Sequence, residues 1–136
     1  DAALSCLESE RHRLAVDLGC GDGRILRAAA RRLGIRVVGY EVNPLAYAKC
    51  RLLCLFHRNV DIRWQNFWRA ELSGADVVFC YLYPDVLKKL AAKLREELRP
   101  GATVISFNFP LPGFTPHQVL RPAGALHNDP IFVYRS

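Results

Sequence analysis

Short apolar runs alternate with longer amphipathic segments along almost the whole chain. The runs are nearly continuous in Val, Ile, Leu, Phe and Cys, which is typical of strands buried on both faces of a parallel sheet. The segments between them carry apolar residues at helical spacing, so each predicts a helix that crosses to the next strand. We expect parallel strands at residues 14–18, 36–41, 60–64, 76–82 and 103–109, and helices at about 23–33, 44–56 and 84–98.

The residues at the ends of these segments agree with this assignment. Asp22 is expected to cap the first helix, which Gly34 ends. Asn43 and Pro44 are expected to open the second helix. Its apolar positions include Leu45, Ala48, Leu52, Leu55 and Phe56. With a helix tail expected within residues 1–9 and a closing antiparallel pair at 118–120 and 131–134, residues 1–136 form one α/β domain.

A glycine-rich turn, VDLGCGDGR at residues 16–24, joins the first strand to the first helix. Open α/β sheets bind ligands at such turns, because the turns lie at the carboxyl edge of the sheet. Gly19, Gly21 and Gly23 place no Cβ between the backbone and a ligand, and they can adopt positive φ. We therefore expect a ligand to lie against this loop.

Two acidic residues narrow the choice of ligand. Asp17 stands two residues before the first glycine, where a carboxylate would repel a pyrophosphate but suit an ammonium group. A dinucleotide site would also need a glycine where Arg24 stands. Glu41, at the end of the second strand, can accept both hydroxyls of a ribose. These residues favour an adenosine-containing ligand that carries an ammonium group.

The order D-x-G-x-G-x-G at residues 17–23 resembles the first motif of class I S-adenosylmethionine (SAM) dependent methyltransferases. The series VDLGCGDGRI, VGYEVNP, DVVFCYLYPDV, KKLAAKLREELRPGA and TVISFNFPLPGFTP is similar to a narrower family of small methyltransferases. That family includes mitochondrial protein-lysine methyltransferases acting on the adenine nucleotide translocase or the ATP synthase c-subunit, and compact bacterial relatives. The resemblance implies an α/β fold with a Rossmann-like, seven-stranded, mostly parallel sheet, one antiparallel strand, and helices on both faces.

The same resemblance implies SAM as the cofactor and assigns residues to it. In this family the loop after the third strand holds the adenine, and Asn66 with Phe67 stands there, although Asn replaces the usual acid. The predicted cofactor residues are Asp17, Gly19, Cys20, Gly21, Gly23, Glu41, Asn66, Phe67 and Tyr81. One difference from the lysine methyltransferases is that residues 1–13 show no counterpart of their segment before the first strand. Since the chain opens at Asp1 and contains no Met, we expect the native start to lie upstream.

The predicted catalytic residues are Tyr81, Tyr83 and Asn108, at the ends of the fourth and fifth strands. Alternation places both tyrosines on one face. Methyl transfer from a sulfonium is an in-line displacement, so positioning and desolvation can do most of the work. Tyrosine hydroxyls can hydrogen-bond an amine acceptor, and the rings suit a methylammonium product.

Composition limits the partners and the compartment. No apolar run is long enough to span a membrane. The five cysteines are odd in number and lack paired C-x-x-C spacing, which predicts reduced thiols, a cytoplasmic protein and no metal site, even at Cys50 and Cys54. The net charge of +6 would suit nucleic acid, but the lysines on the polar face of the 84–98 helix predict a solvated surface instead.

The sequence therefore predicts a SAM-dependent methyltransferase acting on an amine acceptor, with a protein lysine as one candidate. A small-molecule amine or oxygen acceptor competes with the lysine. Two other classes stand beside the enzyme: a nucleotide-binding or NAD-binding module, and a non-catalytic domain that only binds SAM. The oligomeric state is not predicted.

Overall fold

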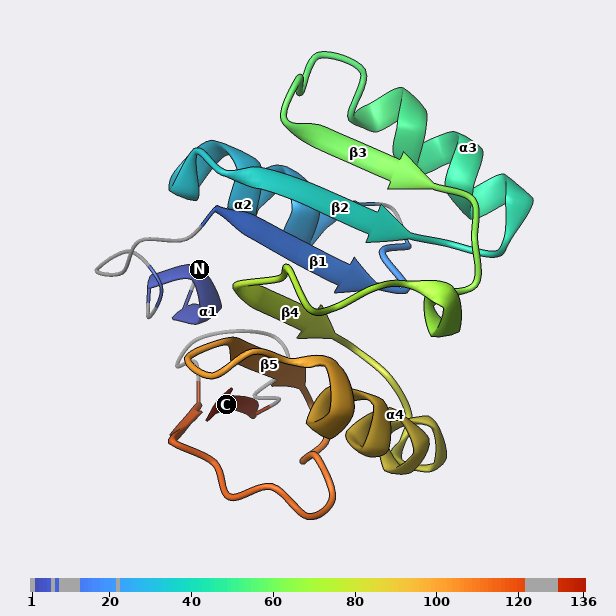
Figure 1. Cartoon of the computed structure of the whole chain (residues 1–136). Helices are drawn as coiled ribbons and strands as arrows, with labels where there is room; N and C mark the ends of the chain where they lie inside the picture. Colours follow the sequence, from blue (N-terminus) through green and yellow to red (C-terminus); the bar gives the residue numbers. More distant parts are fainter. Residues whose placement is uncertain (1, 6, 8–12, 22, 122–129) are drawn as a thin grey trace.

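A computed structural model describes residues 2–5, 7, 13–21, 23–121 and 130–136 (Figure 1). Its centre is a seven-stranded sheet in the order β3-β2-β1-β4-β5-β7-β6. The strands are β1 (Leu14–Leu18), β2 (Arg36–Tyr40), β3 (Val60–Arg63), β4 (Val77–Cys80), β5 (Thr103–Phe107), β6 (Gln118–Leu120) and β7 (Ile131–Arg135). The helices are α1 (Ala2–Ser5), α2 (Arg24–Leu33), α3 (Pro44–Leu53) and α4 (Pro84–Glu97), with a 3-10 turn η1 (Phe67–Arg69).

The strand directions confirm the predicted sheet. Strands β1 to β5 pair in parallel, and β7 pairs antiparallel with both β5 and β6. Strand β6 therefore runs with the first five, and within the described residues only β7 runs the other way. The strand order reverses between β1 and β4, so the loops that follow these two strands diverge at the carboxyl edge. This edge is where a ligand is expected.

Helices cover both faces of the sheet, as predicted (Figure 1). On one face, Leu4 of α1, Leu26 of α2 and Cys50 of α3 belong to one buried cluster. On the other face, Leu87 and Leu90 of α4 belong to a second cluster. Among the described residues, no helix has the length and apolar character needed to cross a membrane.

Four strands end earlier than their apolar runs predict. Glu41, Trp64, Leu82 and Phe109 all lie beyond the last strand residue. Leu82 and Phe109 still pack against the second buried cluster, so their apolar character does not depend on the strand ladder. The predicted strands are otherwise in place, except that β4 begins at Val77 rather than Asp76.

The helix ends agree with the sequence except that α3 ends at Leu53 rather than near residue 56 and that one cap differs. Asn43 caps α3, since its Oδ1 accepts from the backbone N–H groups of Leu45 at 2.9 Å and Ala46 at 3.2 Å. Gly34 ends α2 with a left-handed φ of 64°. The predicted N-cap of α2 is wrong: Gly23 holds that position, and Asp22 lies outside the described residues. Gly23 itself offers no side chain that could cap α2.

The apolar positions of α3 do not face the core. Leu45, Leu52, Leu55 and Phe56 are exposed, as is Ala48. The helix instead packs through Cys50, with Cys54 just beyond its end. Periodicity identified the apolar stripe but not the side of the helix that meets the sheet.

Candidate functional site

The glycine loop leaves β1 in a conformation that depends on glycine. Gly19, Gly21 and Gly23 have φ values of 79°, 55° and 77°, in the left-handed region that side chains with a Cβ rarely adopt. The loop is tied to the neighbouring strand because the backbone N–H groups of Gly19 and Cys20 both donate to the Tyr40 carbonyl at 3.0 Å. The loop is therefore held against β2 at the carboxyl edge.

The glycines have different surroundings. A Cβ at Gly23 would lie 2.6 Å from Cys50 Sγ, whereas a Cβ at Gly21 would meet no atom within 4 Å. Gly23 is thus needed for packing against α3, and Gly21 faces open space that a ligand can fill. The sequence reasoning missed Gly39 in β2, whose Cβ would lie 2.5 Å from Leu26 Cδ1. A glycine inside a buried strand was the available signal, since it marks close backbone approach.

Glu41 joins the loop to the second strand. Its Oε1 accepts from Gly21 N–H at 3.0 Å, and its Oε2 accepts from the N–H groups of Val42 at 3.0 Å and Asn43 at 3.2 Å. A carboxylate offers about four acceptor positions, so these bonds leave capacity for a hydroxyl donor. The predicted ribose residue is therefore oriented by the same loop that would hold the rest of the ligand.

Asp17 is a buried carboxyl group at this edge, only 7% exposed. Burial, with smaller contributions from the neighbouring Cys50 and Glu41 groups, raises the pKa of the Asp17 carboxyl to about 7. Asp17 also borders a cavity of about 320 Å³, lined by Asp17, Gly19, Cys20, Arg24, Ile25, Tyr81 and Phe107. A cationic group in this cavity would favour the ionised carboxylate, so the donor set fits the ammonium group of SAM.

Cys20 contributes through its backbone. Its side chain turns to the core, where Cys20 Sγ lies 3.8 Å from Cys50 Sγ. This thiol contact and burial raise the pKa of Cys20 far above its usual range, so the thiol is not a nucleophile. Within the described part of the chain, no three His, Cys, Asp or Glu side chains converge as a metal site.

The predicted catalytic residues do not share one setting. Tyr81 lines the cavity, and its ring stacks on Phe107 with centroids 6.3 Å apart. Tyr83 instead occupies the N-cap position of α4 and packs on Phe109, with centroids 6.0 Å apart. The two tyrosines are 57% and 72% exposed. Phe107, which the sequence reasoning missed, is the aromatic partner that places Tyr81.

Asn108 follows β5 in an unusual backbone conformation. Its φ of 72° is the one positive value at a non-glycine position among the described residues. Its backbone N–H donates to the Pro130 carbonyl at 2.8 Å. Asn tolerates this region better than most residues, and such positions cluster at functional sites. Asn108 thus lies at the end of the strand that neighbours the one leading to Tyr81.

Asn66 and Phe67 stand apart from the loop cavity. Asn66 Oδ1 accepts from Trp68 N–H at 3.0 Å, which caps η1. Phe67 packs on Trp68, with ring centroids 4.6 Å apart. Neither residue lines the loop cavity. Their predicted contact with adenine stays a prediction.

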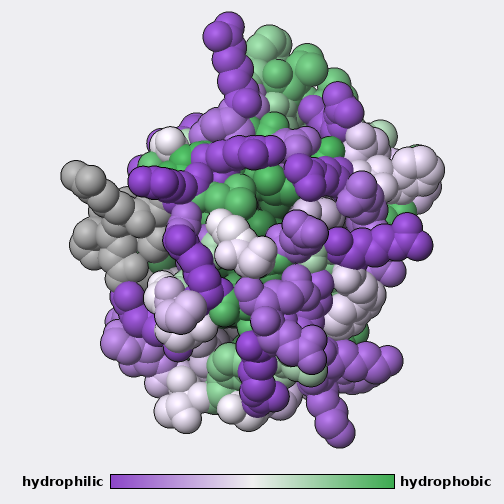
Figure 2. Space-filling view, in the orientation of Figure 1, coloured by the Kyte–Doolittle hydropathy of each residue, from purple (hydrophilic) through white to green (hydrophobic). Residues whose placement is uncertain are grey.

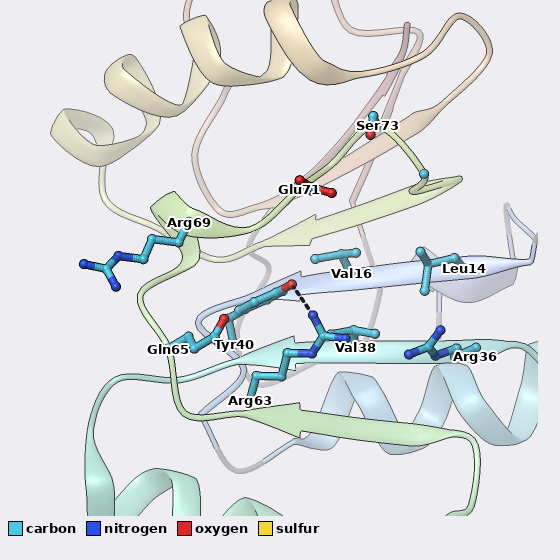
Figure 3. Close-up of a pocket in the computed structure, with 11 residues that line it drawn as sticks. Leu14, Val16, Arg36, Val38, Tyr40, Arg63, Gln65, Arg69, Glu71 and Ser73 are labelled. Atoms are coloured by element: carbon cyan, nitrogen blue, oxygen red, sulfur yellow. Dashed lines mark hydrogen bonds between the residues drawn. The ribbon is translucent and has the colours of Figure 1, made fainter.

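A second cavity lies on the sheet face shared with α4 and has a different character (Figure 3). Its volume is about 470 Å³, and it runs over β1 and β2 beside residues 65–74. Arg63 reaches across it to donate to the Tyr40 hydroxyl at 3.3 Å. Arg36 and Arg63 both pair with Asp61, at 3.9 and 3.2 Å. Because their charges are already paired and no loop glycine lines it, this cavity is the weaker candidate for the cofactor.

Comparison with known proteins identifies similar domains. The model of the ANTKMT methyltransferase domain matches residues 17–118. A protein-lysine N-methyltransferase of Saccharolobus islandicus is 32% identical over 127 residues, which cover 89% of this chain and 78% of that protein. The mouse adenine nucleotide translocase lysine N-methyltransferase is 38% identical over 115 residues, 77% of this chain and 47% of that protein. The chain thus spans about half the length of the mouse relative.

A solved structure shows the same fold. An RNA methyltransferase from Salinibacter ruber, in complex with S-adenosyl-L-homocysteine, superposes with a TM-score of 0.83 and 34% sequence identity. The match covers 94% of this chain and 81% of that one. The fold therefore has a counterpart that was crystallised with the demethylated form of SAM.

Proposed function

Because the chain belongs to the ANTKMT methyltransferase domain family, we propose that this SAM-dependent methyltransferase domain methylates the side-chain amine of a lysine in a protein. The relatives named as lysine methyltransferases support this acceptor. The observation that carries the proposal is that the buried Asp17 and the aromatic Tyr81 line the same cavity. The cavity therefore combines a carboxyl group that can bind a cation with an aromatic wall.

In this proposal the loop residues hold the cofactor. Asp17 faces the ammonium group, the backbone at Gly19, Cys20 and Gly21 follows the methionine part, and Gly23 fixes the loop on α3. Glu41 accepts the ribose hydroxyls, and Asn66 with Phe67 contacts the adenine. When bound, SAM supplies a methyl group made electrophilic by the sulfonium.

The acceptor side is formed by the strand ends. A lysine must lose its proton before it can attack, and the exposed hydroxyls of Tyr81 and Tyr83 can pass that proton to water. The Tyr81 ring, supported by Phe107, offers a face for the methylammonium product. Asn108 adds a polar group next to them. The domain orients the amine toward the methyl group, so no strong base is needed.

The test uses SAM labelled in the methyl group and a lysate of the source cell, with the products separated into protein, RNA and small molecules. We expect the label in protein, and methyl-lysine after acid hydrolysis. A Gly21→Val variant, unable to hold SAM, is the matched control. RNA is measured because the similar Salinibacter protein is an RNA methyltransferase. Label in RNA would contradict a lysine acceptor, and so would label confined to small molecules.

We also propose that the domain works in a reducing compartment such as the cytoplasm. The four cysteines in the described part of the chain are all unbridged and buried. Cell fractionation with an antibody to the protein checks this placement, and recovery from an oxidising compartment would contradict it.

A further inference from the structure

Helix α3 turns its apolar side away from the protein. Leu45, Ala48 and Leu52 share one face of the helix, because they are spaced by three and four residues. Leu45 is 81% exposed and Leu52 71%. The opposite face, through Cys50, meets the core. This is the reverse of the amphipathic pattern expected of a helix that packs on a sheet.

The turn after α3 extends the same surface. Leu55 is exposed, and Phe56 has 91% of its surface exposed. In Figure 1 the α3–β3 connection forms the top of the molecule, and Figure 2 shows hydrophobic side chains gathered there beside long hydrophilic ones. We call Leu45, Ala48, Leu52, Leu55 and Phe56 the α3 patch. Its residues fall within positions 45–56, in the helix and turn that lead to the edge strand β3.

The charges around the α3 patch are mostly positive. One acid, Asp61, shares a hollow with Leu55 and Arg58, and its carboxylate already pairs with Arg36 and Arg63. Between Glu41 and Asp61 the chain contains no acidic residue, but it contains Lys49, Arg51 and Arg58. Arg51 is held at the margin of the patch, because it donates to the Tyr47 hydroxyl at 3.0 Å and lies over the Tyr47 ring. A partner for this surface must therefore be apolar and negatively charged.

An aromatic residue of mixed character adjoins the helix. Trp64 is 59% exposed, its ring lies 6.2 Å from that of Tyr47, and its indole N–H donates to the Val42 carbonyl at 2.9 Å. Tryptophan side chains with an apolar body and a satisfied polar edge are typical of the boundary between lipid and water.

We propose that the α3 patch docks on the surface of a bilayer that contains anionic lipid. Leucine and phenylalanine side chains enter the region between headgroups and acyl chains, while Lys49, Arg51 and Arg58 meet the headgroups. A second copy of the chain is disfavoured as the occupant, since a symmetric contact would bring these cations against one another. The proposal is independent of the methyl-transfer activity, because none of these residues lines the loop cavity.

The experiment measures flotation of the purified chain with vesicles of phosphatidylcholine, with and without about 30% phosphatidylserine. We expect binding only to the anionic vesicles, weakening as salt is added. The double variants Leu52→Gln/Phe56→Gln and Lys49→Gln/Arg58→Gln should each weaken binding about tenfold or more. Matched controls on other surfaces, Val119→Gln and Lys88→Gln/Lys89→Gln, should bind like the parent.

Three results would overturn the proposal. The first is that the parent chain does not bind anionic vesicles, and the second is that the two patch variants bind as the controls do. The third is a dimer in sedimentation that the Leu52→Gln/Phe56→Gln variant dissociates, which would assign the patch to a second copy. Thermal melting of each variant shows that it is folded, and we expect little change because all of the substituted residues are exposed.

Discussion

At the scale of single residues, Asp17 lowers the stability of the ligand-free fold in the same ionised form that would bind a cationic ligand. The carboxyl is buried and its pKa is raised to about 7, so the ionised form is unfavourable in the folded protein. The same ionised form is what a cationic ligand requires. An acid in this position therefore has a structural cost that only the ligand offsets.

The first prediction is that Asp17→Asn stabilises the ligand-free chain at about pH 8 by up to about 4 kcal/mol. Between the unfolded value of 3.8 and about 7, the folded state binds more protons, so the stability of the parent falls as pH rises through this range. The Asp17→Asn variant should lose this pH dependence of stability. Urea unfolding at about pH 5 and about pH 8 measures the free energy of unfolding of both proteins. Equal pH dependence in the two proteins would show that Asp17 is not the titrating group.

The same substitution should weaken SAM binding, and the parent should show the matching proton linkage. As pH falls below about 7, the Asp17 carboxyl is increasingly protonated, so affinity should drop about tenfold per pH unit. Calorimetry of the parent and Asp17→Asn at several pH values measures both effects. A flat pH profile for the parent would place the ammonium group elsewhere.

The second prediction concerns Glu41. Glu41→Ala removes the acceptor of the Gly21 N–H and the proposed acceptor of the ribose hydroxyls, so SAM binding should weaken by about 1–3 kcal/mol. Calorimetry measures the change. Glu71→Ala, which alters an exposed acid, is the control and should bind SAM as the parent does. Unchanged affinity in Glu41→Ala would remove this residue from the cofactor site.

At the scale of elements, the loop between β1 and α2 serves two separate purposes. Gly23 lets the loop pack against α3, and Gly21 keeps the ligand side open. Both have positive φ, so backbone strain alone cannot distinguish them. The atoms that surround each glycine do distinguish them.

The third prediction uses this difference. Gly23→Ala should destabilise the fold strongly, because its Cβ would lie 2.6 Å from Cys50 Sγ. Gly21→Ala should destabilise it only by the cost of a left-handed residue, about 1–2 kcal/mol, while losing most SAM binding. Gly34→Ala is the matched control, with φ of 64° and open space away from the site. If Gly21→Ala bound SAM as tightly as Gly34→Ala, the loop would not cradle the cofactor.

The ends of β4 and β5 form the second functional element. The fourth prediction is that Tyr81→Phe and Tyr83→Phe keep SAM affinity but lower the rate of methyl transfer, since each loses a hydroxyl contact worth about 1 kcal/mol or more. We expect Tyr81 to serve the cofactor side and Tyr83 the acceptor side. Single-turnover rates at saturating SAM measure the effect. Parent-like rates in both variants would shift attention to Asn108 and the loop at residues 110–116.

At the scale of the whole molecule, Asp76 joins parts of the chain that are distant in sequence. Its Oδ2 accepts from the backbone N–H groups of Arg13 at 2.6 Å and Leu14 at 2.8 Å, and its carboxylate pairs with Arg99 beyond α4. The group is only 5% exposed. The start of β1 is thus fixed to β4 at the edge opposite the candidate site.

The fifth prediction is that Asp76→Ala destabilises the fold by about 2–5 kcal/mol, because it leaves two N–H groups without an acceptor and Arg99 without its partner. Urea unfolding measures the loss. At temperatures where the variant is folded, its SAM affinity should match that of the parent. A large loss of affinity in the folded variant would contradict the separation of the two edges.

The sequence by itself determined the order of the elements and the position of the glycine loop. Strands β1 and β4 are buried on both faces, so their apolar runs are continuous and leave little ambiguity. The Asn43 cap and the positive φ values of the loop glycines are local features, set by residues next to one another. The position of Glu41 at the carboxyl edge was predictable because it directly follows an apolar strand. These properties need no knowledge of distant contacts.

Only the tertiary structure decided which sides of the elements meet. Helix α3 lies beside the short edge strand β3, and it approaches the loop through Cys50 and Cys54, whose small side chains fit against Gly23. Its apolar stripe therefore points outward. The sequence could not show this, because periodicity defines an apolar stripe but not which side of the helix meets the sheet. The pairing of Tyr81 with Phe107, the raised pKa of Asp17 and the bonds of Asp76 likewise depend on groups far apart in the chain. Their energies arise from burial and distance, which exist only once the chain has folded.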